Sequence, residues 1–475
     1  MTLGAQMRRL GKHSAIYGLG GIVSRVIAVF LLPLYTRYLE PSDFGAVGLL
    51  VGLSAVLVTI LRAGISSAFF RFYFDAKDTV ERLLVLRTSF WFTMASASAG
   101  LVAGVLLAEP LADLLLLDEP NLVRAAFVGI WAQMNYEQLT SLFRVEERSG
   151  LFVLASLVNI AVTIATTLVL VVGYDQGALG VIVGNFTGTL AVYLALLGYR
   201  RAQLGLQLSR SMLREMNRFG VPLVPSALAL IALNFGDRFF LNELVGTAEV
   251  GRYELGVRIA SAMVLLITAF RTAWPAFAYS IEDDGEAKRT YAFVLTYLVA
   301  AASWLALALG LLSPWLVRLL ATPEYYEGGR VVALLAFGGV AYAGYIVIAI
   351  GVGRAKRTKF NWVITGAAAS ISVVLNLLLV PRYELIGSGI AAASAYAAMF
   401  LGMCWYAQRV FPTPYQWRRV STAAGSAVAL TVLGKLLDVP LAVALGLVAS
   451  YPLVLLLLGF ALPSERRRLR RLVPR

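Results

Sequence analysis

Long apolar stretches alternate with short polar connections along almost the whole chain. About fourteen stretches of roughly 20 hydrophobic residues can be marked, and each is long enough to cross a hydrocarbon core of about 30 Å as a helix. No connection between them is long and polar enough to form a separate water-soluble domain. The pattern predicts an all-α, polytopic membrane protein with about 14 transmembrane helices.

Basic residues gather in every second connection, which predicts the orientation of the chain. Connections such as 109–121, 174–177 and 242–251 contain no Lys or Arg. By the positive-inside rule, we expect the basic connections and both termini to lie in the cytoplasm. The basic clusters lie at residues 8–12, 71–87, 144–148, 200–218, 288–289, 354–359, 409–419 and 466–475.

Composition agrees with this interpretation, since 59% of the 475 residues are hydrophobic and only 14% are charged. The net charge of +14 is accounted for by the cytoplasmic connections, so we expect membrane lipids as partners and no nucleic acid. The first stretch, residues 14–36, is too long for a signal-peptide core and is expected to be retained. Cys404 and His13 are the only residues of their types. We therefore expect no metal site and no cofactor.

An internal repeat with an offset of about 206 residues relates the two halves of the chain. Asp-Phe-Gly at 43–45 matches Glu-Val-Gly at 249–251, and Leu-Gly at 179–180 matches Ile-Gly at 386–387. With six helices per copy, both copies have the same orientation in the membrane. Such parallel repeats are related by an axis along the membrane normal and are typical of alternating-access transporters.

The repeat predicts three parts. These are a six-helix bundle at 1–205, a second at 206–411, and two additional helices with a basic tail at 412–475.

Four strings carry a family resemblance. They are Leu-Pro-Leu-Tyr-Thr-Arg-Tyr-Leu at 32–39, Pro-Ser-Asp-Phe-Gly at 41–45, Phe-Gly-Val-Pro-Leu-Val-Pro-Ser at 219–226 and Asp-Arg-Phe-Phe at 237–240. The chain resembles the oligosaccharide flippases, or polysaccharide biosynthesis proteins of the Wzx type, in the multidrug/oligosaccharidyl-lipid/polysaccharide exporter superfamily. The resemblance covers essentially the whole chain.

The resemblance implies a substrate and a location. Such proteins move undecaprenyl-linked oligosaccharides, joined through phosphate or pyrophosphate, from the cytoplasmic to the periplasmic leaflet of the bacterial inner membrane. A polysaccharide polymerase machinery is then a further expected partner.

Four arginines at membrane depth are the candidates for binding the lipid-linked phosphate: Arg25, Arg62, Arg258 and Arg271. A guanidinium stays charged and offers a planar fork of donors to phosphate oxygens. The resemblance implies that helices one, two and eight line the cavity, which favours Arg25, Arg62 and Arg271. Two alternatives remain open: Arg62 and Arg271 are near enough to the cytoplasmic head groups to snorkel, and Arg258 is spaced to pair with Glu254.

Three carboxylates, Glu137, Asp237 and Glu254, are candidates for coupling transport to H⁺, Na⁺ or the membrane potential. Glu137 lies in a polar patch at 133–138 and could instead bond between helices. Asp237 and Arg238 point about 100° apart on a helix and need not pair, and bridging between helices is the favoured alternative for them.

Polar uncharged residues are candidates for a sugar path, because Tyr stacks on sugar faces and amides match hydroxyls. For any single one, a hydrogen bond to a neighbouring helix is the better interpretation. These residues are Asn159, Asn185, Asn234, Asn376, Tyr342 and Tyr345.

Three other functions compete with oligosaccharide flipping. A membrane polymerase or glycosyltransferase would need acidic metal-binding motifs or a large outer domain, which the chain lacks, so we expect no enzyme. A cation-coupled multidrug exporter of the same superfamily would need an acidic cavity. A peptidoglycan-precursor flippase would have the same architecture, and the sequence distinguishes it poorly from an oligosaccharide flippase.

The Arg25→Ala variant should lose transport while still inserting and folding, because its guanidinium is expected to bind the phosphate at the midplane. Arg25→Lys should retain part of the activity if charge alone is needed, and none if the bidentate fork is needed. Flipping assays on both variants distinguish these cases, and full transport by Arg25→Ala would exclude Arg25 from the anion site.

Overall fold

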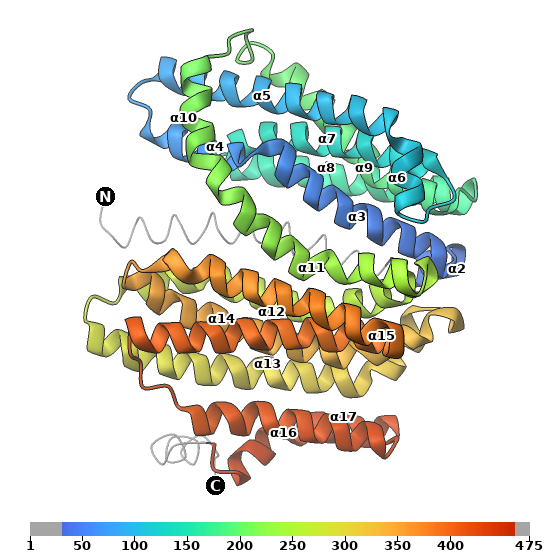
Figure 1. Ribbon diagram of the computed structural model, residues 1–475, viewed down its shortest axis with the longest axis vertical. Helices are drawn as coiled ribbons and strands as arrows, with labels where there is room; N and C mark the ends of the chain where they lie inside the picture. The colour runs from blue at the N-terminus through green and yellow to red at the C-terminus, as the bar shows by residue number, and fades with distance from the viewer. Residues whose placement is uncertain (1–30, 461–475) are drawn as a thin grey trace. The chain divides into compact units, whose positions relative to one another are not determined.

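The computed structural model describes residues 31–460, and every regular element in this range is a helix (Figure 1). The all-α prediction is therefore confirmed for the described chain. Arg25 and most of the predicted first crossing lie outside the described residues.

The first compact unit ends at Glu254, inside the long helix α12. In this unit α7 packs against α5 and α9, while α9 also packs against α8 (Figure 1). The elements of the unit are α2 (Leu32–Tyr38), α3 (Pro41–Arg62), α4 (Ile65–Asp75), α5 (Thr79–Leu106), α6 (Ala108–Leu114), α7 (Pro120–Val145), α8 (Ser149–Leu168), a π-helix (Val169–Gly173), α9 (Gly177–Arg200), α10 (Arg210–Gly220), a 3₁₀ turn (Val221–Leu223), α11 (Val224–Leu244) and the start of α12 (Thr247–Ser280).

The second compact unit begins at Leu255. Helix α14 packs between α13 and α15, and α13 also contacts α16 and α17. The division predicted at residues 205 and 411 follows the sequence repeat and remains a prediction. The elements after α12 are α13 (Asp284–Leu320), a 3₁₀ turn (Pro323–Gly328), α14 (Gly329–Arg354), a second 3₁₀ turn (Thr358–Phe360), α15 (Asn361–Val410), α16 (Trp417–Leu436) and α17 (Leu441–Leu457).

Nine helices within residues 31–460 are long and apolar enough to cross a membrane. One of them, α15, is 50 residues long and has non-helical backbone angles at Glu384 (φ 47°, ψ −124°). It therefore consists of two successive helices that meet at a kink at this residue. Helices α7 and α16 have 26 and 20 residues, and α17 is a shorter apolar helix. These elements, with the first predicted crossing, are consistent with about 14 membrane helices.

Matching capping residues begin α5 and α13. The Asp78 side chain accepts a hydrogen bond from the N–H of Glu81 at 2.7 Å, and Asp283 accepts one from the N–H of Glu286 at 2.7 Å. Each bond satisfies one of the free N–H groups at a helix start. The two caps are 205 residues apart, close to the offset of the sequence repeat.

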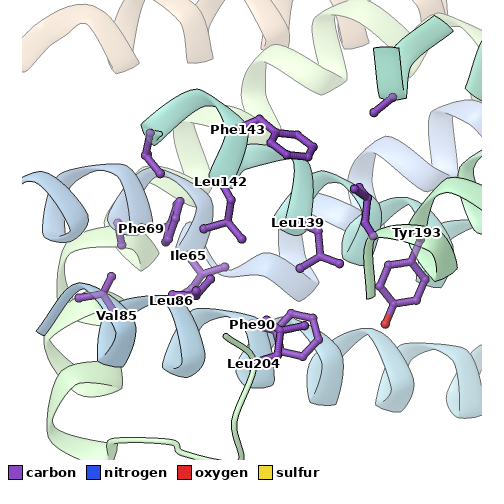
Figure 2. Packing of buried hydrophobic residues seen from close by; sticks show 14 of the residues in the cluster. Ile65, Phe69, Val85, Leu86, Phe90, Leu139, Leu142, Phe143, Tyr193 and Leu204 are labelled. Carbon is purple, nitrogen blue, oxygen red and sulfur yellow. The ribbon is translucent and has the colours of Figure 1, made fainter. Parts of the chain in front are cut away.

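Aromatic side chains from four helices form the packed core of the first unit (Figure 2). Phe69 of α4, Phe90 of α5, Phe143 of α7 and Tyr193 of α9 are each at most 2% exposed. Leu204, in the connection after α9, packs against the same cluster. Because lipid tails are as apolar as these side chains, close van der Waals packing is what holds the helices together.

Phe69→Ala should lower the free energy of unfolding by about 3–5 kcal/mol, because it leaves a cavity in this core. Phe74→Ala is the matched control, since Phe74 lies on the same helix and is 64% exposed. Its effect should stay below about 1 kcal/mol. Reversible unfolding in mixed micelles measures both, and equal losses would contradict the assigned core.

Candidate functional site

Arg62 lies in the last turn of α3, where the chain makes a sharp turn. The next two residues, Ala63 and Gly64, have left-handed backbone angles (φ 47° and 74°), which end the helix. Gly64 is packed against Gly220 of α10 so closely that a Cβ at Gly64 would collide with the Gly220 backbone. The position of Arg62 is therefore fixed by a backbone contact that requires glycine.

The Arg62 guanidinium binds a polar patch on α7. Its Nη1 lies 2.6 Å from Oε2 of Glu137, and its Nη2 donates to the carbonyl oxygen of Met134 at 3.3 Å. The Gln133 amide donates to the other Glu137 oxygen at 2.9 Å. The structure thus brings together one residue predicted to bind phosphate and one predicted to couple transport.

This ion pair is only partly buried. The Arg62 side chain is 14% exposed and that of Glu137 is 39% exposed. Phosphate oxygens match the guanidinium fork as carboxylate oxygens do. The pair can therefore exchange its carboxylate for another anion without exposing an isolated buried charge.

A second charged cluster joins α11 to the start of α12. Nη1 of Arg238 lies 2.9 Å from Oδ1 of Asp237 and 2.6 Å from the carbonyl oxygen of Asn234, and its Nε donates to Glu254. The Tyr253 hydroxyl donates to the other oxygen of Asp237. The side chains of Asp237, Arg238 and Glu254 are at most 10% exposed. We call these four side chains (Asp237, Arg238, Tyr253 and Glu254) the buried cluster.

The buried cluster bears on two pairings considered from the sequence. Asp237 and Arg238 do pair with each other, because the long Arg238 side chain reaches back around the helix. Glu254 binds Arg238 of α11, whereas its expected pairing with Arg258 remains a prediction. A Cβ at Gly48 of α3 would lie 2.7 Å from Cγ of Glu254, so this glycine leaves room for the carboxylate.

Equivalent glycines of the repeat meet where α3 crosses the start of α12. A Cβ at Gly45 would collide with the carbonyl oxygen of Thr247 and lie 3.0 Å from the Gly251 nitrogen. A Cβ at Gly251 would collide with the carbonyl oxygen of Pro41. The two helix starts therefore touch backbone to backbone, as small residues allow in membranes.

The remaining predicted arginines lie on the part of α12 that belongs to the second unit. The side chain of Arg258 is partly buried and that of Arg271 is exposed. Thirteen residues along a helix correspond to about 20 Å of rise and about 140° of rotation. One phosphate therefore cannot contact both of these side chains at once.

The four candidate asparagines make bonds to their own or neighbouring helices. Asn159 accepts from Thr163 at 3.2 Å, and the Asn185 carbonyl oxygen accepts from the same hydroxyl at 3.3 Å. Asn234 donates to the carbonyl oxygen of Leu230 at 2.6 Å. The buried amide of Asn376 donates to the Ser372 carbonyl oxygen at 2.8 Å and accepts from Ser388 at 2.9 Å.

The candidate tyrosines of α14 form an aromatic surface. The rings of Tyr342 and Tyr345 stack with centroids 6.0 Å apart and an interplanar angle of 11°. Tyr396 of α15 packs against Tyr342 at 5.4 Å. Both candidate tyrosines are partly buried, so part of this surface is accessible.

Sequence reasoning missed Gln133 and Tyr253 as partners of the charged groups, because contacts between helices have no fixed spacing. The polar patch at 133–138 was the available signal for Gln133. Among residues 31–460, no group of three or more His, Cys, Asp and Glu side chains is arranged to hold a metal ion.

Comparison with known sequences gives a family and two relatives. Residues 10–280 match the family described as polysaccharide biosynthesis protein. The chain is 23% identical over 212 residues to an uncharacterised membrane protein of Methanocaldococcus jannaschii, a match covering 42% of this chain and 41% of that protein. It is also 23% identical over 202 residues to the amylovoran biosynthesis protein AmsL of Erwinia amylovora, covering 41% and 52%. The chain therefore spans about half or less of the length of these relatives.

Comparison with solved structures shows the fold. The lipid II flippase MurJ in an inward closed conformation superposes with a TM-score of 0.74 at 12% identity, covering 94% of this chain and 98% of that chain. A multidrug resistance MATE family transporter of the MOP superfamily, in an inward-facing conformation, gives a TM-score of 0.65 at 16% identity, covering 82% and 98%.

Arg238→Leu should lower the free energy of unfolding by about 3–5 kcal/mol, because it leaves two carboxyl groups of the buried cluster without their cation. Adding Asp237→Asn and Glu254→Gln to this variant should restore much of the loss. Arg124→Leu is the control, since Arg124 pairs with Glu109 at an exposed helix end and should contribute about 0–1 kcal/mol. Unfolding in mixed micelles gives all three values, and a small loss in Arg238→Leu would contradict the assigned role.

Proposed function

Because the chain belongs to the polysaccharide biosynthesis protein family, we propose that it flips undecaprenyl-(pyro)phosphate-linked oligosaccharide repeat units. Transport runs from the cytoplasmic to the periplasmic leaflet of a bacterial inner membrane and serves cell-surface polysaccharide synthesis. Both termini lie in the cytoplasm, as the distribution of basic residues favours. The name of AmsL, an amylovoran biosynthesis protein, supports a role in making such a polymer.

The observation that carries this proposal is the partly buried ion pair between Arg62 and Glu137. The lipid-linked phosphate binds the Arg62 guanidinium in place of the Glu137 carboxylate, so the arginine keeps an anionic partner throughout. Release of the phosphate restores the original pair. The displaced carboxylate can then bind H⁺ or Na⁺, which is one way to couple transport; the membrane potential is the alternative.

Alternating access moves the phosphate between leaflets. In the described state the starts of α3 and α12 touch through Gly45 and Gly251. We propose that these helix starts separate when the substrate leaves on the periplasmic side. Backbone contacts of this kind involve few side chains, so they can open without breaking buried ion pairs.

Two related functions are retained as alternatives. The likeness to the lipid II flippase MurJ favours a peptidoglycan-precursor substrate, which carries the same diphosphate group. The likeness to a multidrug resistance transporter favours export of cationic drugs. The guanidinium of Arg62 favours an anionic substrate over a cationic one. A polysaccharide polymerase is the proposed partner that consumes the flipped unit.

Deleting the gene should cause the complete undecaprenyl-linked repeat unit to accumulate in the cytoplasmic leaflet, which mass spectrometry of lipid-linked glycans measures. In the deletion strain, the Arg62→Ala variant should support a flux of the repeat unit at least about tenfold lower than the natural protein does. The reason is that a charge-assisted bond to phosphate contributes about 1.5–3 kcal/mol. Arg124→Ala should complement fully.

Three outcomes would redirect the proposal. An unchanged lipid pool with greater sensitivity to cationic drugs would support the exporter, and accumulation of the peptidoglycan precursor would support that flippase. Full complementation by Arg62→Ala at equal protein level would remove Arg62 from the phosphate site.

A further inference from the structure

A cavity of about 450 Å³ lies at one end of the second unit. It is bordered by the C-terminal ends of α13 and α16, the start of α14 and the 3₁₀ turn between α13 and α14. Helices α13 and α16 pack against each other here (Figure 1). The charged and aromatic side chains that line the cavity are Trp315, Arg318, Tyr326, Arg330, Lys435 and Asp438.

Basic residues at the opposite end of this unit predict which membrane face the cavity occupies. Arg354, at the end of α14, lies 2.6 Å from Asp284 at the start of α13 and donates to the carbonyl oxygen of Glu282 at 2.8 Å. These helix ends carry the basic clusters 288–289 and 354–359, which predict the cytoplasmic face. The cavity is at the other end of α13 and α14, and so on the predicted periplasmic face.

Three cations from three helices meet at this cavity. Arg330 pairs with Glu327 at 2.5 Å, whereas among residues 31–460 the side chains of Arg318 and Lys435 form no hydrogen bond or ion pair. Asp438 is the only acidic residue in the lining, so the cavity keeps a net positive charge. Periplasmic connections elsewhere in the chain are poor in basic residues, which makes this concentration unusual.

Helix dipoles do not account for all three cations. Arg318 and Lys435 lie in the last turns of α13 and α16, where a positive charge is favourable. Arg330 lies in the first turn of α14, where a positive charge is unfavourable. Its partner Glu327 is 55% exposed and lies outside the lining, so the Arg330 guanidinium still borders the cavity beside the other two cations.

Two aromatic side chains give the depth of the cavity. Trp315 is partly buried and Tyr326 is 38% exposed, and both line the cavity. Trp and Tyr concentrate at the level of lipid head groups, where one edge of the ring is apolar and the other is hydrated. These two side chains therefore favour a position of the cavity at the level of the lipid head groups.

We infer that this cavity binds the phosphate group of a lipid in the outer leaflet. Arg318 and Lys435 bind its oxygens, and Arg330 adds a third positive charge. The phosphate belongs either to an anionic phospholipid or to a polyprenyl-linked product that has already been flipped. The site is distinct from the Arg62–Glu137 pair, and its existence does not depend on the proposed function.

Native mass spectrometry of the full-length protein in nanodiscs tests the inference. The probes are dioleoylphosphatidylglycerol, dioleoylphosphatidylcholine and undecaprenyl phosphate, with inorganic phosphate as the lipid-free anion. The double variant Arg318→Gln/Lys435→Gln should retain about tenfold less of the preferred anionic lipid. Arg382→Gln, which removes an exposed arginine of α15 outside the cavity, should retain as much lipid as the natural protein.

The double variant Arg318→Lys/Lys435→Arg is the control for folding, because it changes the same two positions and keeps both positive charges. It should retain as much anionic lipid as the natural protein. Preferential retention of phosphatidylglycerol supports a bulk phospholipid, and preferential retention of undecaprenyl phosphate supports the flipped product. Unchanged retention in the glutamine double variant would overturn the inference, as would binding of inorganic phosphate without any preference for an anionic lipid. None of these readouts uses transport, so this inference and the proposed function can fail separately.

Discussion

A guanidinium buried among membrane helices loses its hydration, and the first unit offsets this cost with carboxylates from other helices. Arg62 of α3 is held by Glu137 of α7, and Arg238 of α11 is held by Glu254 at the start of α12. Each ion pair joins two helices that are far apart along the chain or separated by a turn. The arrangement of the polar groups therefore constrains which helices can be neighbours, and apolar packing then fills the space between them.

The sequence repeat has a physical counterpart at the crossing of α3 and α12. Gly45 and Gly251 occupy equivalent positions in the two copies and lie against each other. A contact between equivalent residues agrees with the predicted parallel repeat. The same correspondence appears in the caps of α5 and α13, where an Asp accepts from the N–H of a Glu three residues later.

The all-α class and the polytopic architecture could be predicted from the sequence, because hydrocarbon thickness sets the length of apolar stretches. The family could be predicted from strings such as 219–226, and the match over residues 10–280 confirms it. The partners of the charged residues could not be predicted. Arg62 and Glu137 are 75 residues apart, and their contact depends on how two helices pack rather than on any spacing. Asp237 and Arg238 point about 100° apart on α11, and they pair because the Arg238 side chain is long enough to reach the Asp237 carboxylate.

Burial separates the two charged clusters by role. The side chains of Asp237 and Arg238 are 6% and 5% exposed, and Arg238 also makes contacts with a backbone carbonyl and with the Phe235 ring at 4.9 Å. Removing any partner there would leave a desolvated charge, so this cluster suits a fixed joint between helices. Glu137 is 39% exposed, and water can solvate its carboxylate when it leaves Arg62. An anion that replaces it meets a guanidinium already oriented by the Met134 carbonyl oxygen. Of the two ion pairs, the one between Arg62 and Glu137 therefore joins an arginine whose orientation is fixed to a carboxylate that water can reach.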